Sequence, residues 1–90
     1  MYKINFSKKI IKFLQKRNYK FREKFISFFE EISANPFTEK LDIKPLKGYK
    51  KHYRLRINKY RILFKIIDSN TILCYDADSR GSVYKMRSKN

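Results

Sequence analysis

The chain has 90 residues and a strongly unbalanced charge: 23 Lys and Arg stand against 8 Asp and Glu, which gives a formal net charge of +15 at pH 7. This length predicts one small domain that spans residues 1–90. The single cysteine excludes an internal disulfide and a cysteine-rich zinc site, and no apolar run approaches the roughly 20 residues of a membrane span. No apolar segment follows the first basic residue, so we expect no secretory signal and a cytoplasmic protein.

The positive charge indicates an anionic partner. A field of this sign attracts anions from a distance, and the phosphates of nucleic acid are the partner that it favours most. An acidic protein is the second candidate. A membrane partner is not expected, because the basic residues are spread along the whole chain.

The N-terminal third predicts one short strand and two helices. Residues 2–6 alternate as a strand does, and Ser7 can cap the helix that follows. This first helix places its apolar residues on one face: Ile10, Ile11, Phe13 and Leu14. Asn18 interrupts the pattern, and residues 20–34 predict a second helix. Its apolar stripe consists of Phe21, Phe25, Phe28, Phe29 and Ile32.

The rest of the chain predicts a long loop and then strands. Asn35 is expected to form a left-handed cap at the end of the second helix, and residues 36–51, with both prolines, are expected to form the loop. The expected strands are residues 51–57, 60–67 and 70–76, joined by turns at Asn58-Lys59 and at residues 68–70. Residues 82–86 could add an edge strand or wrap the sheet. The order β-α-α-β-β-β predicts an α+β fold in which two N-terminal helices cover one face of a small antiparallel sheet.

Alternation along the two central strands separates an apolar face from a cationic one. The residues expected to meet the helices are Tyr53, Leu55, Ile57, Tyr60, Ile62, Phe64 and Ile66. The residues expected to face water are His52, Arg54, Arg56, Arg61, Leu63 and Lys65, so this face is expected to be nearly all cationic. A solvated face that only keeps the protein soluble is one interpretation. Arginine is the side chain that binds phosphate with a planar fork, however, and Tyr49, Tyr75 and Tyr84 flank the patch and could stack on bases.

No cofactor or metal site is expected. The two glycines do not form a phosphate loop, and one histidine cannot make a zinc site. Asp76 and Asp78 are close in sequence but lack further ligands, and Cys74 is expected to be a small hydrophobic residue of the last long strand.

Several short motifs resemble one known family. They are "NPF" after the second helix, "PLKG" at 45–48, "YRLRINKYRILFKI" at 53–66 and "SRGSVYK" at 79–85. On the basis of these motifs, the chain resembles the RelE/ParE superfamily of toxins from type II toxin–antitoxin systems over nearly its whole length. The resemblance is greatest to the RelE branch. The resemblance implies a RelE-like fold and a ribosome-dependent endoribonuclease that needs no metal. In such enzymes a 2′-hydroxyl of the messenger RNA attacks its own adjacent phosphate.

The resemblance also implies roles for individual residues. Arg54 and Arg56 occupy the two basic positions of the first sheet strand, and Arg61 matches the arginine that contacts the scissile phosphate. Arg80 falls near a general-acid or phosphate-binding position, and Tyr84 matches the tyrosine that stacks on or orients the base. Substrate binding is further expected from Lys47, His52 and Lys65.

Two departures from the family pattern leave the proton acceptor open. The best-studied RelE-like enzymes have lysines where this chain has Arg54 and Arg56, and arginine hardly ever deprotonates. Other relatives use a carboxylate before the "PLK" motif and a histidine before the closing tyrosine. This chain has Lys44 and Ser79 at those two positions. Tyr84, His52 or a solvent molecule could accept the proton.

Two other functions are weighed against the nuclease. One is a ParE-like poison that binds DNA gyrase and has no nuclease activity, and the other is a basic RNA-binding module that does not cut. Under either toxin reading we expect an acidic antitoxin as partner, and under the nuclease reading also the ribosome and mRNA.

Overall fold

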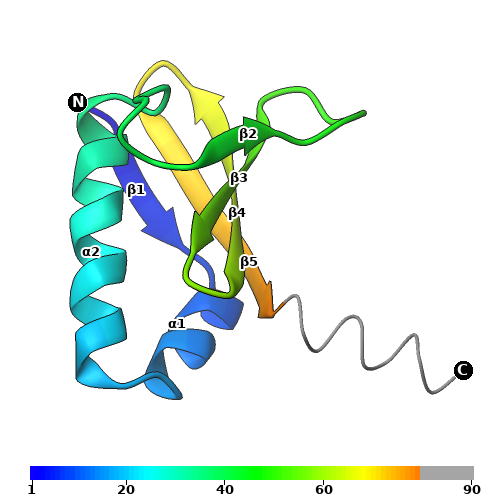
Figure 1. Ribbon diagram of the computed structural model, residues 1–90. Helices are drawn as coiled ribbons and strands as arrows, with labels where there is room; N and C mark the ends of the chain where they lie inside the picture. The colour runs from blue at the N-terminus through cyan, green and yellow to red at the C-terminus, as the bar shows by residue number, and fades with distance from the viewer. Residues whose placement is uncertain (80–90) are drawn as a thin grey trace, which may run out of the picture.

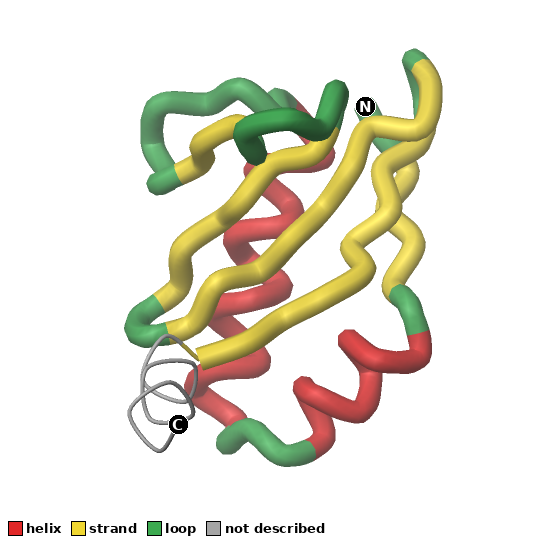
Figure 2. The backbone as a smooth tube through the Cα atoms, turned by 90° about the vertical axis from the view of Figure 1, so that its right-hand side faces the viewer, coloured by secondary structure: helices red, strands yellow, loops and turns green. Residues whose placement is uncertain are grey.

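The computed structural model describes residues 1–79 and shows two helices against one face of a five-stranded sheet (Figure 1). The elements are β1 (Lys3–Phe6), α1 (Lys8–Gln15), α2 (Tyr19–Ala34), β2 (Ile43–Pro45), β3 (His52–Ile57), β4 (Tyr60–Asp68) and β5 (Thr71–Ser79). The strands lie in the order β1-β5-β4-β3-β2, and the tube view follows them across the sheet (Figure 2). The predicted α+β class is confirmed.

Side-chain caps begin both helices close to the predicted positions. The hydroxyl of Ser7 accepts a hydrogen bond from the Ile10 amide at 3.2 Å, and the Asn18 side chain accepts one from the Phe21 amide at 2.8 Å. The expected left-handed cap at Asn35 is wrong, because this residue is extended with φ −158°. Its side chain instead accepts from the Phe37 amide at 3.0 Å and so stabilises the turn that leaves α2.

The core lies between α2 and the sheet, as predicted. Phe29 meets Phe64 of β4 edge to face, with ring centroids 6.0 Å apart. The buried apolar residues are Ile10, Phe21, Phe25, Phe29, Ile32, Leu55, Ile57, Ile62, Phe64, Ile72 and Cys74. One predicted core residue is misplaced: Ile11 is 47% exposed, because α1 covers the sheet with the row that contains Ile10 and turns Ile11 toward solvent.

The sheet has more strands and more varied pairing than the sequence indicates. Residues 43–45, inside the predicted loop, form β2 and pair antiparallel with β3 as an edge strand, where proline is tolerated. β1 pairs in parallel with β5, so the sheet is mixed. The predicted strand at 82–86 lies outside the described residues. Within residues 1–79, no helix is both long and apolar enough to cross a membrane.

Candidate functional site

The face of the sheet opposite the helices brings five of the predicted site residues together. Arg56 lies opposite Arg61, and His52 lies opposite Lys65, with Arg54 between them on β3. Their neighbours Leu55, Ile57, Ile62 and Phe64 are buried beneath the helices, so alternation turns these five side chains to the other side. We call His52, Arg54, Arg56, Arg61 and Lys65 the arginine face.

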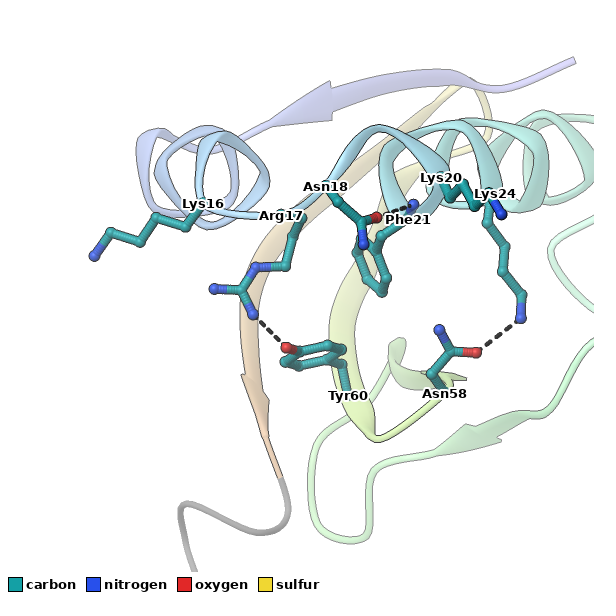
Figure 3. A pocket seen from close by; sticks show the side chains of 8 residues that line it. All are labelled: Lys16, Arg17, Asn18, Lys20, Phe21, Lys24, Asn58 and Tyr60. Atoms are coloured by element: carbon teal, nitrogen blue, oxygen red, sulfur yellow. Dashed lines mark hydrogen bonds between the residues drawn. The ribbon is translucent and has the colours of Figure 1, made fainter.

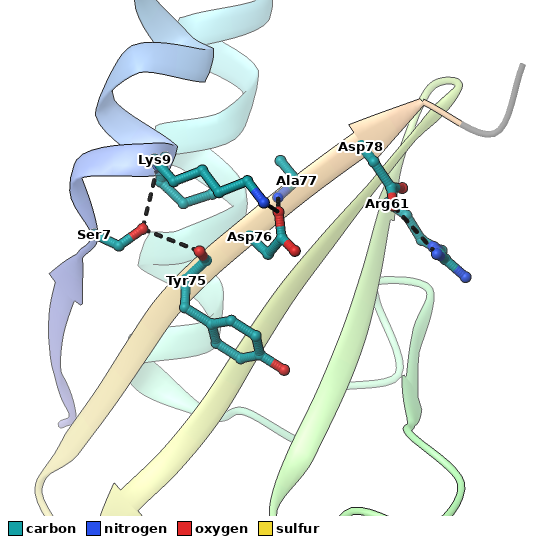
Figure 4. A network of polar contacts seen from close by, with 8 residues as sticks. Ser7, Lys9, Arg61, Tyr75, Asp76, Ala77 and Asp78 are labelled. Carbon is teal, nitrogen blue, oxygen red and sulfur yellow. Dashed lines mark hydrogen bonds and ion pairs between the residues drawn. The ribbon is translucent and has the colours of Figure 1, made fainter. Parts of the chain in front are cut away.

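The arginine face includes acidic partners, which corrects the expectation that it holds almost no acid. Asp42, just before β2, lies 3.3 Å from Arg54, and Asp78 near the end of β5 lies 3.3 Å from Arg61 (Figure 4). The sequence pattern does not predict these partners, because it indicates a loop over residues 43–45 and a last strand that ends at residue 76, whereas the structure has β2 there and extends β5 to Ser79. Two of the three arginines are thus held by carboxylates.

Some nitrogen atoms of these guanidinium groups nevertheless make no hydrogen bond within residues 1–79. The buried Nε atoms of Arg56 and Arg61 have no hydrogen-bond partner within the described residues. The Nη1 atom of Arg54 is close enough to Asp42 for an ion pair but lacks the geometry of a hydrogen bond. These enclosed nitrogen atoms therefore carry positive charge that no hydrogen bond within residues 1–79 compensates.

Aromatic residues gather at the other end of the arginine face. The Nδ1 atom of His52 and the hydroxyl of Tyr75 are 2.8 Å apart, and the exposed Tyr49 ring lies 5.7 Å from the imidazole. Burial, followed by the negative charge of Asp76, raises the pKa of Tyr75. The phenol therefore stays protonated at neutral pH and can donate or accept a hydrogen bond without ionising. Two of the three flanking tyrosines, Tyr49 and Tyr75, thus accompany the cations.

The remaining residues near β5 have structural explanations. Burial, and then the charge of Asp76, raises the pKa of the Cys74 thiol, so this cysteine stays neutral and packs as the predicted hydrophobic residue. Asp76 is 2.9 Å from Lys9 of α1 and accepts from the Ala77 amide, so it ties β5 to the helix (Figure 4).

One predicted site residue within the described part of the chain does not join the arginine face, and two others lie outside that part. Lys47 lies exposed in the connection between β2 and β3. Arg80 and Tyr84 lie outside the described residues, so their roles stay predictions.

Comparisons with known proteins agree with this fold. The profile of the ParE toxin family of the type II toxin–antitoxin system parDE matches residues 4–81. Toxin RelE3 of Methanocaldococcus jannaschii is 33% identical over 84 residues, which cover 91% of this chain and 94% of that toxin. The chain belongs to the RelE/ParE superfamily of type II toxins.

Solved structures place the toxin in the RelE branch of this superfamily. The antitoxin–toxin complex RelB–RelE from Methanococcus jannaschii matches with a TM-score of 0.73 and 32% identity, covering 90% of this chain and 95% of that one. The archaeal RelE–RelB complex from Pyrococcus horikoshii matches with a TM-score of 0.77 and 25% identity, covering 89% and 96%. The predicted RelE-like fold and the predicted family are both confirmed.

Proposed function

We propose that this toxin cleaves messenger RNA on the ribosome by metal-independent attack of a 2′-hydroxyl on the adjacent phosphate. The observation that supports it most is the meeting of Arg54, Arg56 and Arg61 on one sheet face, with donors that lack partners within residues 1–79. The likeness to RelE toxins over nearly the whole chain supports the same reaction. A substrate that is being translated implies that the toxin acts in the cytoplasm.

The arginine face suits the charge that develops in this reaction. Attack of the hydroxyl produces a phosphorane-like transition state with more negative charge than the phosphodiester. Fixed guanidinium groups stabilise that charge more than they stabilise the ground state, which is the requirement for catalysis. Arg61 and Arg56 lie side by side across β3 and β4, so both can reach one phosphate, while Arg54 extends the same positive row.

The carboxylates Asp42 and Asp78 give the free toxin a resting state. Each neutralises one arginine, and a phosphate that binds there takes the place of the carboxylate. At Arg61 the exchange is inexpensive, because both side chains of its pair with Asp78 are partly exposed and such pairs contribute at most about 1 kcal/mol. The carboxylates thereby hold the guanidinium groups in position until RNA arrives.

The aromatic end of the arginine face suits the bases next to the cleaved bond. The exposed ring of Tyr49 can stack on a base, and the hydrogen bond to Tyr75 fixes the orientation of His52. His52 is the described residue that could accept the 2′-hydroxyl proton, beside a solvent molecule or Tyr84.

A cognate antitoxin is the other expected partner. The relatives from Methanococcus jannaschii and Pyrococcus horikoshii were both solved with a RelB antitoxin. Against a toxin with a net charge of +15, we expect the toxin-binding segment of the antitoxin to be acidic.

Inhibition of DNA gyrase is the second candidate, because the matching family profile is that of the ParE toxin. This function requires no nuclease site, so it gives no reason for three arginines to share one face. A gyrase supercoiling assay with the purified toxin separates the two proposals. Inhibition of supercoiling together with intact transcripts would favour the gyrase target.

A reconstituted translation reaction followed by primer extension tests the nuclease directly. The wild-type toxin is expected to cut within codons of translated message, and Arg61→Ala is expected to lower the cleavage rate on the order of 10²–10³-fold. Lys40→Ala removes one exposed positive charge in the connection between α2 and β2, away from the arginine face, and serves as the charge-matched control. Intact transcripts with folded wild-type toxin would refute the proposal, and transcripts bound but uncut would indicate a plain RNA-binding module.

A further inference from the structure

A second cationic region lies on the helix side of the molecule, where α2 begins next to the turn between β3 and β4 (Figure 3). It is a cavity of about 550 Å³. Four of its eight lining residues are cationic and none is acidic. The cationic residues are Lys16, Arg17, Lys20 and Lys24, and we call this cavity the α2 pocket.

Arg17 is held in the α2 pocket by aromatic rings instead of by an acid. Its Nη1 atom donates a hydrogen bond to the Tyr60 hydroxyl. Its guanidinium carbon lies 4.7 Å from the centre of the Phe13 ring and 5.0 Å from that of Tyr60. Its buried Nε atom has no hydrogen-bond partner within residues 1–79. The guanidinium is therefore fixed in place while its charge remains uncompensated.

The other walls of the pocket add positive potential. Asn18 caps α2, whose first turn carries no acid, so the positive end of the helix dipole lies at the pocket. Lys24 donates to the side chain of Asn58, 2.8 Å away, which ties α2 to the turn (Figure 3). All the ion pairs within residues 1–79 lie elsewhere: Lys9–Asp76, Lys40–Glu31, Arg54–Asp42 and Arg61–Asp78.

The α2 pocket and the arginine face lie on opposite sides of the same hairpin end. Tyr60 pairs with Ile57 next to the turn and packs against the helices, whereas the following residue, Arg61, points to the other side of the sheet. Only the two-residue turn Asn58-Lys59 separates the two regions at this end. A polymer with regularly spaced negative charges could contact both by passing around the turn.

We propose that the α2 pocket binds the phosphate backbone of RNA next to the strand held on the arginine face. The inference rests on the proposed function, because it takes RNA to be the substrate of that face. Phosphate fits the pocket because the lining offers one fixed guanidinium, three ammonium groups and no carboxylate. The backbone could belong to the message or to ribosomal RNA, which share this chemistry.

The test compares two double variants with equal changes of charge. Lys20→Gln with Lys24→Gln neutralises the pocket, and Lys3→Gln with Lys40→Gln removes two exposed charges outside it. Binding to purified ribosomes is measured over a range of salt concentrations. The pocket variant is expected to bind roughly tenfold more weakly than the control variant. It should also lower the magnitude of the salt slope by about 1.4, since two phosphate contacts are lost.

The outcomes separate the pocket from the nuclease proposal and identify the source of the RNA. A defect on vacant ribosomes indicates ribosomal RNA, and a defect only on ribosomes that carry a message indicates the message. Equal binding by the two variants would overturn the inference. So would a pocket variant that loses affinity for the antitoxin alone, because the pocket would then bind an acidic protein segment.

The nuclease proposal can fail separately from this inference. Wild-type toxin that binds ribosomes without cutting the message would refute the nuclease. The ratio of the ribosome affinities of the pocket variant and the control variant would still show whether the α2 pocket binds RNA.

Discussion

The two cationic regions of this toxin differ in what compensates their charge. On the arginine face, Arg54 and Arg61 are paired with carboxylates 3.3 Å away. In the α2 pocket, no lining residue is acidic, and Arg17 is fixed by aromatic rings. In the first region, carboxylates hold two of the three arginines in a defined geometry, whereas no lining residue of the second region compensates its charge.

This difference suggests a division of tasks. Uncompensated surface charge acts over a distance of about a Debye length and raises the rate and strength of association. Paired guanidinium groups contribute less at long range, but they are already oriented when the phosphate arrives. We therefore expect the α2 pocket to govern binding and the arginine face to govern the chemical step, and the predictions below separate these two effects.

After Arg61→Ala, the largest expected effect is the loss of cleavage in Arg54→Ala. The side chain of Arg54 is only 11% exposed, so its guanidinium is held close to the sheet in the middle of the positive row. Its removal should lower the cleavage rate at saturating ribosomes about 100-fold, because a fixed charge near the transition state is lost. Single-turnover cleavage measured by primer extension gives the rate.

Arg54→Lys serves as the matched control for this prediction. It retains the charge and most of the stem but loses the fork, so it should recover part of the rate. The pocket variant Lys20→Gln with Lys24→Gln should instead cleave at the wild-type rate once ribosomes are saturating. An unchanged rate in Arg54→Ala, or a fall in rate with the pocket variant, would break the proposed division.

Local patterns in the sequence predicted the helices and the central strands because these elements are determined by local signals. The phenylalanine spacing of α2 and the strict alternation in β3 and β4 define their buried faces without tertiary information. The arginine face followed from that alternation, since a two-residue turn at Asn58-Lys59 leaves only one register for the hairpin. Asn58 adopts φ 54°, as a turn of this kind requires.

The features that the sequence could not reveal depend on contacts between distant segments. β1 pairs with β5 across most of the chain, and β2 is only three residues long and includes a proline. The acid partner of Arg61 follows from β5 extending to Ser79, beyond the bulge at which Leu63 pairs with Asp76 and Phe64 with Cys74. The α2 pocket requires the helix junction and the β3–β4 turn to meet, which no local pattern encodes.

The next prediction concerns how the α2 pocket is built. Tyr60→Phe removes the hydroxyl that accepts from Arg17 while it keeps the ring that packs against Phe13 and Phe21. The variant should lose about 1 kcal/mol of unfolding free energy, the usual net contribution of one hydrogen bond. It should also bind ribosomes a few-fold more weakly, because the guanidinium is less well fixed. Urea unfolding and ribosome binding measure the two effects.

Tyr53→Phe is the control for this prediction. The hydroxyl of Tyr53 makes no hydrogen bond within the part of the chain that the structure describes, and its ring stacks on Phe64. It should therefore change neither stability nor binding appreciably. If Tyr60→Phe behaves in the same way, the hydroxyl does not fix Arg17, and the aromatic rings alone determine its position.

The smallest expected effect is a gain of affinity in Asp78→Asn. The substitution keeps the shape of the side chain but removes the charge that competes with RNA for Arg61, 3.3 Å away. Since a partly exposed ion pair contributes at most about 1 kcal/mol, ribosome binding should tighten by roughly two- to fivefold. Glu39→Gln makes the same change of charge at an exposed site and controls for the general increase in positive charge.

Combining Asp78→Asn with the pocket variant tests whether the arginine face and the α2 pocket contribute independently to binding. No hydrogen bond or ion pair within residues 1–79 joins Asp78 to the α2 pocket, so the gain from Asp78→Asn and the loss from Lys20→Gln with Lys24→Gln should add in free energy. Weaker binding by Asp78→Asn, with Glu39→Gln unchanged, would show that the carboxylate positions Arg61 for the phosphate instead of competing with it. The ion pairs of the arginine face would then be part of the bound state, and Asp78→Asn should lower the cleavage rate as well.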